Sequence, residues 1–258
     1  MLELLAAALS SFTSSREWEE YLRVQAKFHS YSSRNAILIA SQFPEATKVA
    51  GYRRWKELNR QVVRGARAIR IVAPVIAGDG AVTGFRTACV FDISQTTGSP
   101  LPQPVALLAG DDPVGFCSAL VACASKLNFV VEFGALPAGV NGVCSHAKTL
   151  IRIESRNSPL HQAKTLVHEL AHACLHGESG IAVRTAEIEA ESVAYVVCNH
   201  FGIDSASYSL GYISDWAGKG AGAAEAVLAV GERVQQAAAK IIAMLDLGGA
   251  ELPASGNR

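Results

Sequence analysis

The chain has 258 residues, of which half are hydrophobic and 18% are charged, and its 23 Lys and Arg balance 23 Asp and Glu. This composition is typical of a globular protein and excludes disordered and collagenous classes. No apolar run approaches the roughly 18 residues that a membrane helix needs. The apolar start carries Glu3 and no basic segment, so we expect no signal peptide. The six cysteines form no C-x-x-C pair, which indicates a reducing, cytoplasmic setting.

The N-terminal part of the chain is predicted to mix helices with strands. A helical pattern covers residues 15–42, either as one helix or as two that are separated at residues 30–33, and Phe43-Pro44 ends it. The next predicted elements are a short helix over 52–59 and strands over 68–73 and 85–93, the first strand closed by Pro74. Residues 94–113, rich in Pro, Gly and Thr, are predicted to be a linker or a surface crossing.

The C-terminal part is predicted to be mainly helical, with Gly177 and Gly202 as helix stops. The predicted elements are helices over 114–127, 160–176, 185–201, 207–216 and 221–247, a strand over 128–133, and a hairpin that joins 142–144 to 149–154. We therefore predict an α+β fold in two modules. A small α/β module covers residues 1–95, a linker 96–112, and a mainly helical domain with a C-terminal helix 113–258.

The strongest chemical signal is an H-E-x-x-H motif, His168-Glu169-Leu-Ala-His172, on a predicted helix. Residues i and i+4 lie one turn apart on the same face, so both imidazoles reach one metal ion. Glu169 stands beside the first ligand, where it can accept a proton from a water at the metal and act as the catalytic base. Apolar neighbours indicate that this stretch is buried, and buried ionisable groups need partners. The motif therefore predicts a Zn²⁺ site rather than two surface histidines.

A catalytic zinc usually takes three protein ligands and a water. A metzincin would need His at position 178 and Gly at 175, where this chain has Glu178 and Leu175. The following helix offers three glutamates instead. Glu187, which opens an E-x-x-A sequence, is the preferred third ligand, and Glu191, one turn later, is the alternative. We expect Glu189 to point elsewhere on the helix, and at least one of the three glutamates to lie on a solvated acidic face.

Other polar residues near the motif have open roles. His176 continues the one-turn spacing and is either a helix-end histidine near the last carbonyls or a group beside the metal or the substrate. An oxyanion-stabilising donor could come from Tyr195, Tyr208 or His146, among which the sequence does not choose.

The neutral net charge hides a split between the two halves. Residues 1–75 hold 12 Lys and Arg against 6 Asp and Glu, whereas residues 76–258 hold 11 against 17. Residues 48–70 interleave eight basic side chains with Tyr52 and Trp55. This combination is typical of single-stranded nucleic-acid sites, although a solvated basic face with Trp55 in a core explains it equally well. The candidate DNA contacts are Tyr52, Arg53, Arg54, Trp55, Lys56, Arg60, Arg64 and Arg67.

Two sets of motifs resemble known families. The first set resembles the ArdC N-terminal domain of antirestriction proteins, and it comprises Phe28-His-Ser-Tyr31-Ser32-x-x-Asn35, Gln42-Phe-Pro44, Val49-Ala-Gly51-Tyr52-x-x-Trp55 and Val90-Phe-Asp-Ile-Ser-Gln95-Thr96. The second set resembles the ImmA/IrrE type of zinc metallopeptidase, through Thr165-Leu-x-His168-Glu169-Leu-x-His172 and Glu187-x-x-Ala190. The resemblance implies single-stranded DNA binding in the first module and a gluzincin-like, zincin-type domain in the second.

We therefore predict a zinc metallopeptidase that binds single-stranded DNA, hydrolyses an unidentified protein substrate and serves antirestriction or a DNA-damage response. The alternative is a non-catalytic antirestriction protein that coats single-stranded DNA, in which zinc is structural or vestigial. A third hypothesis is a regulator that cleaves one repressor when single strands appear. No membrane partner is expected, and the sequence leaves the oligomeric state open.

Overall fold

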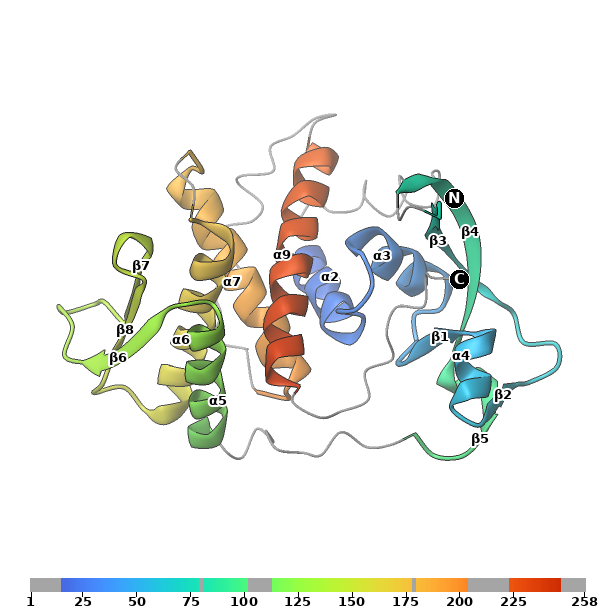
Figure 1. Ribbon diagram of the computed structural model, residues 1–258, viewed down its shortest axis with the longest axis horizontal. Helices are drawn as coiled ribbons and strands as arrows, with labels where there is room; N and C mark the ends of the chain where they lie inside the picture. Colours follow the sequence, from blue (N-terminus) through green and yellow to red (C-terminus); the bar gives the residue numbers. More distant parts are fainter. Residues whose placement is uncertain (1–14, 79–80, 102–112, 178–179, 204–222, 247–258) are drawn as a thin grey trace. The chain divides into compact units, whose positions relative to one another are not determined.

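The computed structural model describes residues 15–78, 81–101, 113–177, 180–203 and 223–246 (Figure 1). The chain separates into two compact units by its contacts. Among the described residues, unit 1 holds 27–101, and unit 2 holds 15–26 together with 113–246. The α+β fold predicted from the sequence is confirmed, with strands and short helices in unit 1 and a mainly helical unit 2.

Unit 1 is built on an antiparallel sheet of three strands in the order β1-β4-β3. These strands are β1 (Val49–Gly51), β4 (Val82–Asp92) and β3 (Ile69–Ile76). One face of β3 is buried through Ile69, Ile71 and Ala73, as expected for alternating side chains. A second, two-stranded sheet pairs β2 (Arg60–Val62) with β5 (Thr96–Gly98), so these residues of the predicted linker form a strand.

Helix α3 (Ser33–Gln42) protects the outer edge of β3. Its N-cap Ser32 starts a helix separate from α2, which matches the expectation of two helices. Asn35 makes two hydrogen bonds with the backbone of Val72, at 2.8 and 2.9 Å, and Gln42, two turns later, bonds the N–H and C=O of Arg70. These two side-chain amides satisfy backbone groups at the edge of β3 that a neighbouring strand would otherwise bond. Pro74 does not end the strand, because the N–H that it lacks would point to this same edge.

The short helix α4 (Tyr52–Glu57) follows β1 directly. The loop before β1 is held by Asp92, a buried carboxylate that accepts hydrogen bonds from the N–H groups of Thr47, Lys48 and Ser94. Burial alone would raise the pKa of Asp92, but these N–H groups outweigh it and lower the pKa. The 3₁₀ turn η1 (Ile93–Gln95) begins at this residue through a capping box with Gln95.

Unit 2 packs helices around a small mixed sheet in the order β6-β8-β7. Its elements are α2 (Ser15–Lys27, whose last residue lies in unit 1), α5 (Pro113–Lys126), β6 (Val130–Gly134), β7 (Gly142–Ser145), η2 (His146–Lys148), β8 (Leu150–Glu154), α6 (Pro159–Leu175), α7 (Val183–His200) and α9 (Ala223–Leu245). Strand β8 pairs parallel with β6 and antiparallel with β7. Ile151 and Ile153 on β8 are fully buried, and helix α6 packs beside this strand and β7.

A buried carboxylate closes the end of β8. Glu154 accepts hydrogen bonds from the N–H of Leu136 and from both the backbone and the guanidinium of Arg156. These donors, with the Arg156 side chain the largest influence, lower the pKa of Glu154 to about 2.

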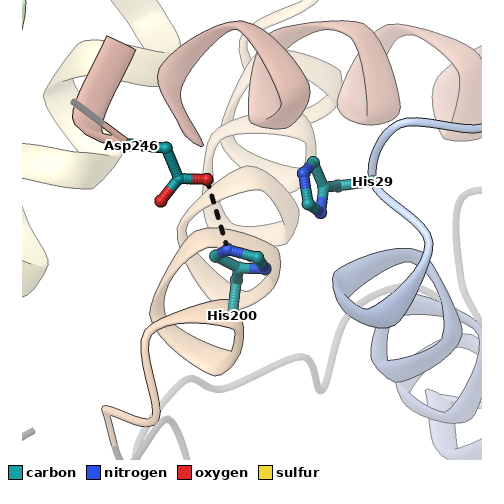
Figure 2. A group of neighbouring side chains, drawn as sticks. All are labelled: His29, His200 and Asp246. Atoms are coloured by element: carbon teal, nitrogen blue, oxygen red, sulfur yellow. Dashed lines mark ion pairs between the residues drawn. The ribbon is translucent and has the colours of Figure 1, made fainter. Parts of the chain in front are cut away.

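Helices α7 and α9 pack against each other, and α2 packs against both. Trp18 donates to Ser192 Oγ at 3.1 Å, and Gln25 donates to the carbonyl of Gly231. Helix α2, which the predicted boundaries assign to the N-terminal module, therefore belongs to unit 2 by its contacts. Figure 2 shows the ion pair between His200, at the end of α7, and Asp246, just after α9, at 3.8 Å.

The predicted helix over 207–216, Tyr208 and most of the predicted linker lie outside the described residues. Within the described residues, no helix is long and apolar enough to cross a membrane.

Candidate functional site

Helix α6 carries three histidines on one face. Ser158 caps its start by accepting from the N–H of His161, and Pro159 occupies the first turn, where a missing N–H costs nothing. His168, His172 and His176 then follow at intervals of four residues, so their rings are neighbours along one face, with the first pair edge-on and the second tilted.

His168, His172 and Glu187 bring three donor atoms to one point. The two Nε2 atoms lie 3.0 Å apart, and the Glu187 carboxylate, on α7, lies 3.5 Å from His168 Nε2 and 3.4 Å from His172 Nε2. The three residues form a potential metal-binding group within the described part of the chain. Glu191 lies on the other side of His168, with Oε1 3.6 Å from Nδ1. The two candidate third ligands therefore face different atoms of the same imidazole.

The residues of this cluster have pKa values that are shifted in different directions. Burial alone would lower the pKa of His168, but the carboxylates of Glu187, Glu191 and Glu169 outweigh it and raise the pKa. Burial and the neighbouring His168 lower the pKa of His172 to about 4. The hydrogen bond with His168 lowers the pKa of Glu187. The carboxylate-rich site thus attracts one positive charge, and a metal cation would displace a proton there.

Glu169 lies beside the cluster, pressed against strand β7. Its side chain is buried, and burial is the main cause that raises its pKa to about 7, with the Glu187 charge adding to the effect. The N–H of Cys144 donates a hydrogen bond to this carboxylate. Gly142 leaves the necessary space, because a Cβ there would lie 2.6 Å from Glu169 Oε1. A carboxyl group with this pKa can both accept and release a proton near neutral pH.

A cavity of about 690 Å³ opens next to the cluster. His168, Glu169, Glu187 and Glu191 line one part of it, and residues of the loop before β7 and the first turns of α6 line the rest. Its volume falls within the range usual for ligand sites.

Beyond His172, a line of contacts runs through His176 and Glu189 to Arg233. His172 Nδ1 lies 2.9 Å from His176 Nδ1, and His176 Nε2 lies 2.9 Å from Glu189. Arg233 on α9 donates two hydrogen bonds to Glu189. Glu189 does point away from the metal cluster, but it lies in the interior and not on a solvated face, since only 1% of it is exposed. In the sequence, Arg233 could be noticed only as a charged residue among mostly apolar positions on one face of α9.

The candidate oxyanion donors have other contacts. Tyr195 is buried, accepts from Arg23 and donates to Glu19, both on α2. His146 bonds the carbonyl of His172 through Nε2 at 3.0 Å. Neither residue lines the described cavity.

The candidate DNA contacts in unit 1 separate into three groups. Trp55 is fully buried and donates to the carbonyl of Phe91, so the structure places it in the core and corrects its prediction as a stacking residue. Arg54 pairs with Glu57, and Arg60 holds β5 through bonds to Thr96 and Ser99. The exposed members are Tyr52, Arg53, Lys56, Arg64 and Arg67.

The sheet also carries an exposed aromatic residue that the sequence reasoning missed. Phe85 on β4 is 73% exposed and lies opposite Pro74 of β3. Arg70 and Arg86, on the same pair of strands, are exposed as well. Arg70 lies on the same face of the sheet as Phe85, four positions along, whereas Arg86 points to the opposite face. An exposed phenylalanine with an arginine on its own face has the composition of a single-strand stacking site. The sequence signal was the apolar Phe85 within a strand whose neighbours are polar or small.

Comparisons with known proteins match two regions of the chain, and the first match includes α2, which the contacts assign to unit 2. Residues 4–87 match the N-terminal domain of anti-restriction factor ArdC, and residues 133–206 match the IrrE N-terminal-like domain of a peptidase family. The chain joins an ArdC N-terminal domain to an IrrE-like peptidase domain. The resemblance predicted from the motifs is therefore confirmed, and the second domain has a metallopeptidase-like fold.

Individual relatives extend the match. An uncharacterized protein of Bacillus anthracis is 25% identical over 272 residues, which cover 85% of this chain and 46% of that protein, so this chain spans about half of that curated relative. The Mn(II)-bound crystal structure of antirestriction protein ArdC from plasmid R388 has a TM-score of 0.52, 18% identity and 86% coverage of both chains. Its metal-free form has a TM-score of 0.47 and 18% identity, with 83% of this chain and 85% of that chain covered. The likeness to the Mn(II)-bound structure shows a shared fold.

Proposed function

We propose that unit 2 is a zinc-dependent peptidase that hydrolyses a peptide bond of a protein substrate, and that unit 1 binds single-stranded DNA. The observation that carries the first half is the convergence of His168, His172 and Glu187 beside the buried carboxylate of Glu169. We also propose that the protein serves antirestriction or a DNA-damage response, and the match to the N-terminal domain of anti-restriction factor ArdC supports the first of these. We also propose that the protein acts in the cytoplasm.

The distances between the donor atoms support zinc. Ligands at about 2.0–2.2 Å from a tetrahedral zinc are separated from one another by roughly 3.4 Å. Here the two Nε2 atoms lie 3.0 Å apart, and Glu187 brings one carboxylate oxygen to 3.5 Å from His168 Nε2 and the other to 3.4 Å from His172 Nε2, which is close to that separation. Two imidazoles and one carboxylate also bind Mn²⁺, but zinc binds such donors more tightly. We therefore assign Glu187 as the third ligand and place Glu191 behind His168.

In the proposed reaction, His168, His172 and Glu187 would hold the cation, which would supply Lewis-acid chemistry to the scissile carbonyl and to a water. Glu169 accepts a proton from the attacking water and delivers it to the leaving amine. The Cys144 N–H together with the Gly142 backbone holds its carboxylate in place, and its burial, which raises the pKa, favours uptake of the proton. The peptide would lie in the cavity that Glu169 and Glu187 line.

A pair of variants tests the metal assignment. Glu187→Gln removes a ligand and is expected to abolish stoichiometric zinc binding. Glu191→Gln, one turn away, removes a partner of His168 and is expected to cost only ~10–100-fold in affinity. Elemental analysis and chelator competition measure both. Equal zinc affinity in the two variants would contradict Glu187 as the ligand.

Glu169→Gln tests the chemistry. This variant should keep one zinc per chain and lose hydrolysis of a peptide library followed by mass spectrometry, by ~10²–10⁴-fold. Zinc-dependent hydrolysis that survives the substitution would refute the role of Glu169. Zinc binding with no hydrolysis in the unsubstituted protein would instead favour the non-catalytic DNA-coating alternative.

DNA binding by unit 1 is supported by the exposed basic side chains and by Phe85. Replacing Arg64 and Arg67 together by alanine removes two phosphate contacts and should reduce the slope of log affinity against log salt by about 1.4. Phe85→Ala should weaken binding by ~1–3 kcal/mol at unchanged slope, because it removes one stacked base. Arg152→Ala, in unit 2, is the matched control for loss of charge. Unchanged affinity in the Phe85 and the double arginine variants would refute this surface.

A further inference from the structure

A chain of polar groups, buried at His176 and Glu189 and half-exposed at Arg233, leads away from His172 across three helices. It runs from His172 Nδ1 to His176, from His176 Nε2 to Glu189 on α7, and from Glu189 to Arg233 on α9, with three successive contacts of 2.8–2.9 Å. We propose that this chain is a positioning device, which holds His172 in the single tautomer whose Nε2 lone pair faces the metal. The inference rests on the proposed metal site and assigns roles to His176, Glu189 and Arg233.

The order of the protons follows from what each group can donate. A guanidinium only donates, and Arg233 gives two hydrogen bonds to Glu189, one to each carboxylate oxygen. The ionised carboxylate only accepts, so a neutral His176 must carry its proton on Nε2, which faces Glu189. The lone pair of His176 therefore lies on Nδ1. That atom accepts from His172 Nδ1–H, and His172 is left with a free lone pair on Nε2.

The opposite order fails at one contact. If His172 carried its proton on Nε2, its Nδ1 would accept from His176 Nδ1–H. The lone pair of His176 would then face a carboxylate oxygen at 2.9 Å, with no proton between the two acceptors. Arrangements of this kind are not tolerated for buried groups. Tautomers of metal-binding histidines are set in this way by the bond of the second ring nitrogen.

The chain also ties the end of helix α6 to α9. Arg233 Nη2 donates to the carbonyl of Leu175 at 3.2 Å, in the last turn of α6, where carbonyl groups lack helical partners. Burial alone would raise the pKa of Glu189, but the bonds from His176 and Arg233 outweigh it and keep the carboxylate charged. The two histidine ligands are thus supported differently. His168 Nδ1 faces the carboxylate of Glu191, whereas His172 reaches a carboxylate through a second imidazole.

Glu189→Gln tests the device with almost no change in shape. Arg233 donates to the amide oxygen of the new side chain, so its NH₂ group faces His176 Nε2 and donates to it. That reverses both tautomers and leaves a proton on His172 Nε2. We expect ¹⁵N NMR of the histidine rings in metal-free protein to show the proton of His172 on Nδ1 in the unsubstituted protein and on Nε2 in the variant. Zinc affinity by chelator competition should fall ~10–100-fold.

His176→Phe is the second variant, since it keeps a ring at this position and removes both hydrogen bonds. It should leave His172 as a mixture of tautomers and weaken zinc binding without reversing the spectrum. Thermal unfolding monitors folding of both variants. Unchanged tautomers in Glu189→Gln would overturn the inference, whatever the zinc affinity. An unsubstituted protein that binds no zinc would refute the proposed function, while the spectra of metal-free protein would still decide the tautomer.

Discussion

Replacing Gly142 by alanine is expected to displace Glu169 without changing any residue of the metal cluster. A Cβ at this position would lie 2.6 Å from Glu169 Oε1, 2.9 Å from its Cγ and 2.6 Å from Thr165 Cγ2. Favourable contacts between heavy atoms lie at about 3.5–4.0 Å, so these groups must move by roughly 1 Å. Glu169 has little room to move, because it is buried and bonded to the N–H of Cys144.

The size of the effect follows from this overlap. Overpacking a buried site costs ~1–3 kcal/mol of unfolding free energy. A shift of about 1 Å in a catalytic group costs ~10²-fold in rate. We therefore expect Gly142→Ala to lose about 1–3 kcal/mol of stability and about 10²-fold in peptide hydrolysis. Its zinc affinity should be retained, since His168, His172 and Glu187 are not displaced.

Gly134→Ala is the matched control in the same sheet. Its Cβ would meet only Arg152 Nη2, at 3.7 Å, which is an ordinary contact, so stability should change by less than about 0.5 kcal/mol. Urea unfolding, chelator competition and mass spectrometry of a digested peptide library measure the three quantities. If Gly142→Ala were as stable and as active as Gly134→Ala, the close approach of β7 to Glu169 would be refuted.

Three further predictions concern parts of the fold that support the two units. Asn35→Ala leaves the N–H and C=O of Val72 without their partners and should cost ~2–4 kcal/mol in urea unfolding, against ~1 kcal/mol for Gln42→Ala, whose bonds are exposed. Trp55→Ala should cost ~3–5 kcal/mol, and DNA affinity of the folded fraction should not change. Glu154, with its pKa lowered from 4.5 to about 2, stabilises the fold above pH ~4.5 and loses that contribution as the pH falls toward 2. The stability advantage over Glu154→Gln in thermal unfolding should shrink across that range.

The parts of the site that lie on one helix could be predicted from the sequence. His168, Glu169 and His172 are separated by one turn at most, so helical geometry alone places them together. Glu187 comes from the next helix, and only the choice between it and Glu191 was left open. The distances favour Glu187, which faces Nε2 of both histidines.

The residues that the sequence did not reveal depend on tertiary packing. Arg233 reaches the site from α9, and no local pattern relates it to Glu189. Trp55 sits in a basic segment that suggested exposure, but burying its ring against β4 outweighed the polarity of its neighbours. In the same way, the Pro74 signal ended the predicted strand too early, since β3 is an edge strand.

The chain of polar groups from His172 to Arg233 bears on whether the site is a relic. The Glu189 carboxylate is buried while the Arg233 side chain is 40% exposed, so burying the carboxylate has an electrostatic cost, and replacing buried charged groups by apolar residues is often neutral or stabilising. Stability alone therefore gives little reason to keep them. The orientation of the His172 ring gives a reason to keep them, because the Glu189 carboxylate influences His172 only through its contact with His176. Loss of metal binding would remove that reason, and the chain of Arg233, Glu189 and His176 would then be free to drift to apolar residues. Under the proposed function, this chain of contacts has a role that it would lack in a relic.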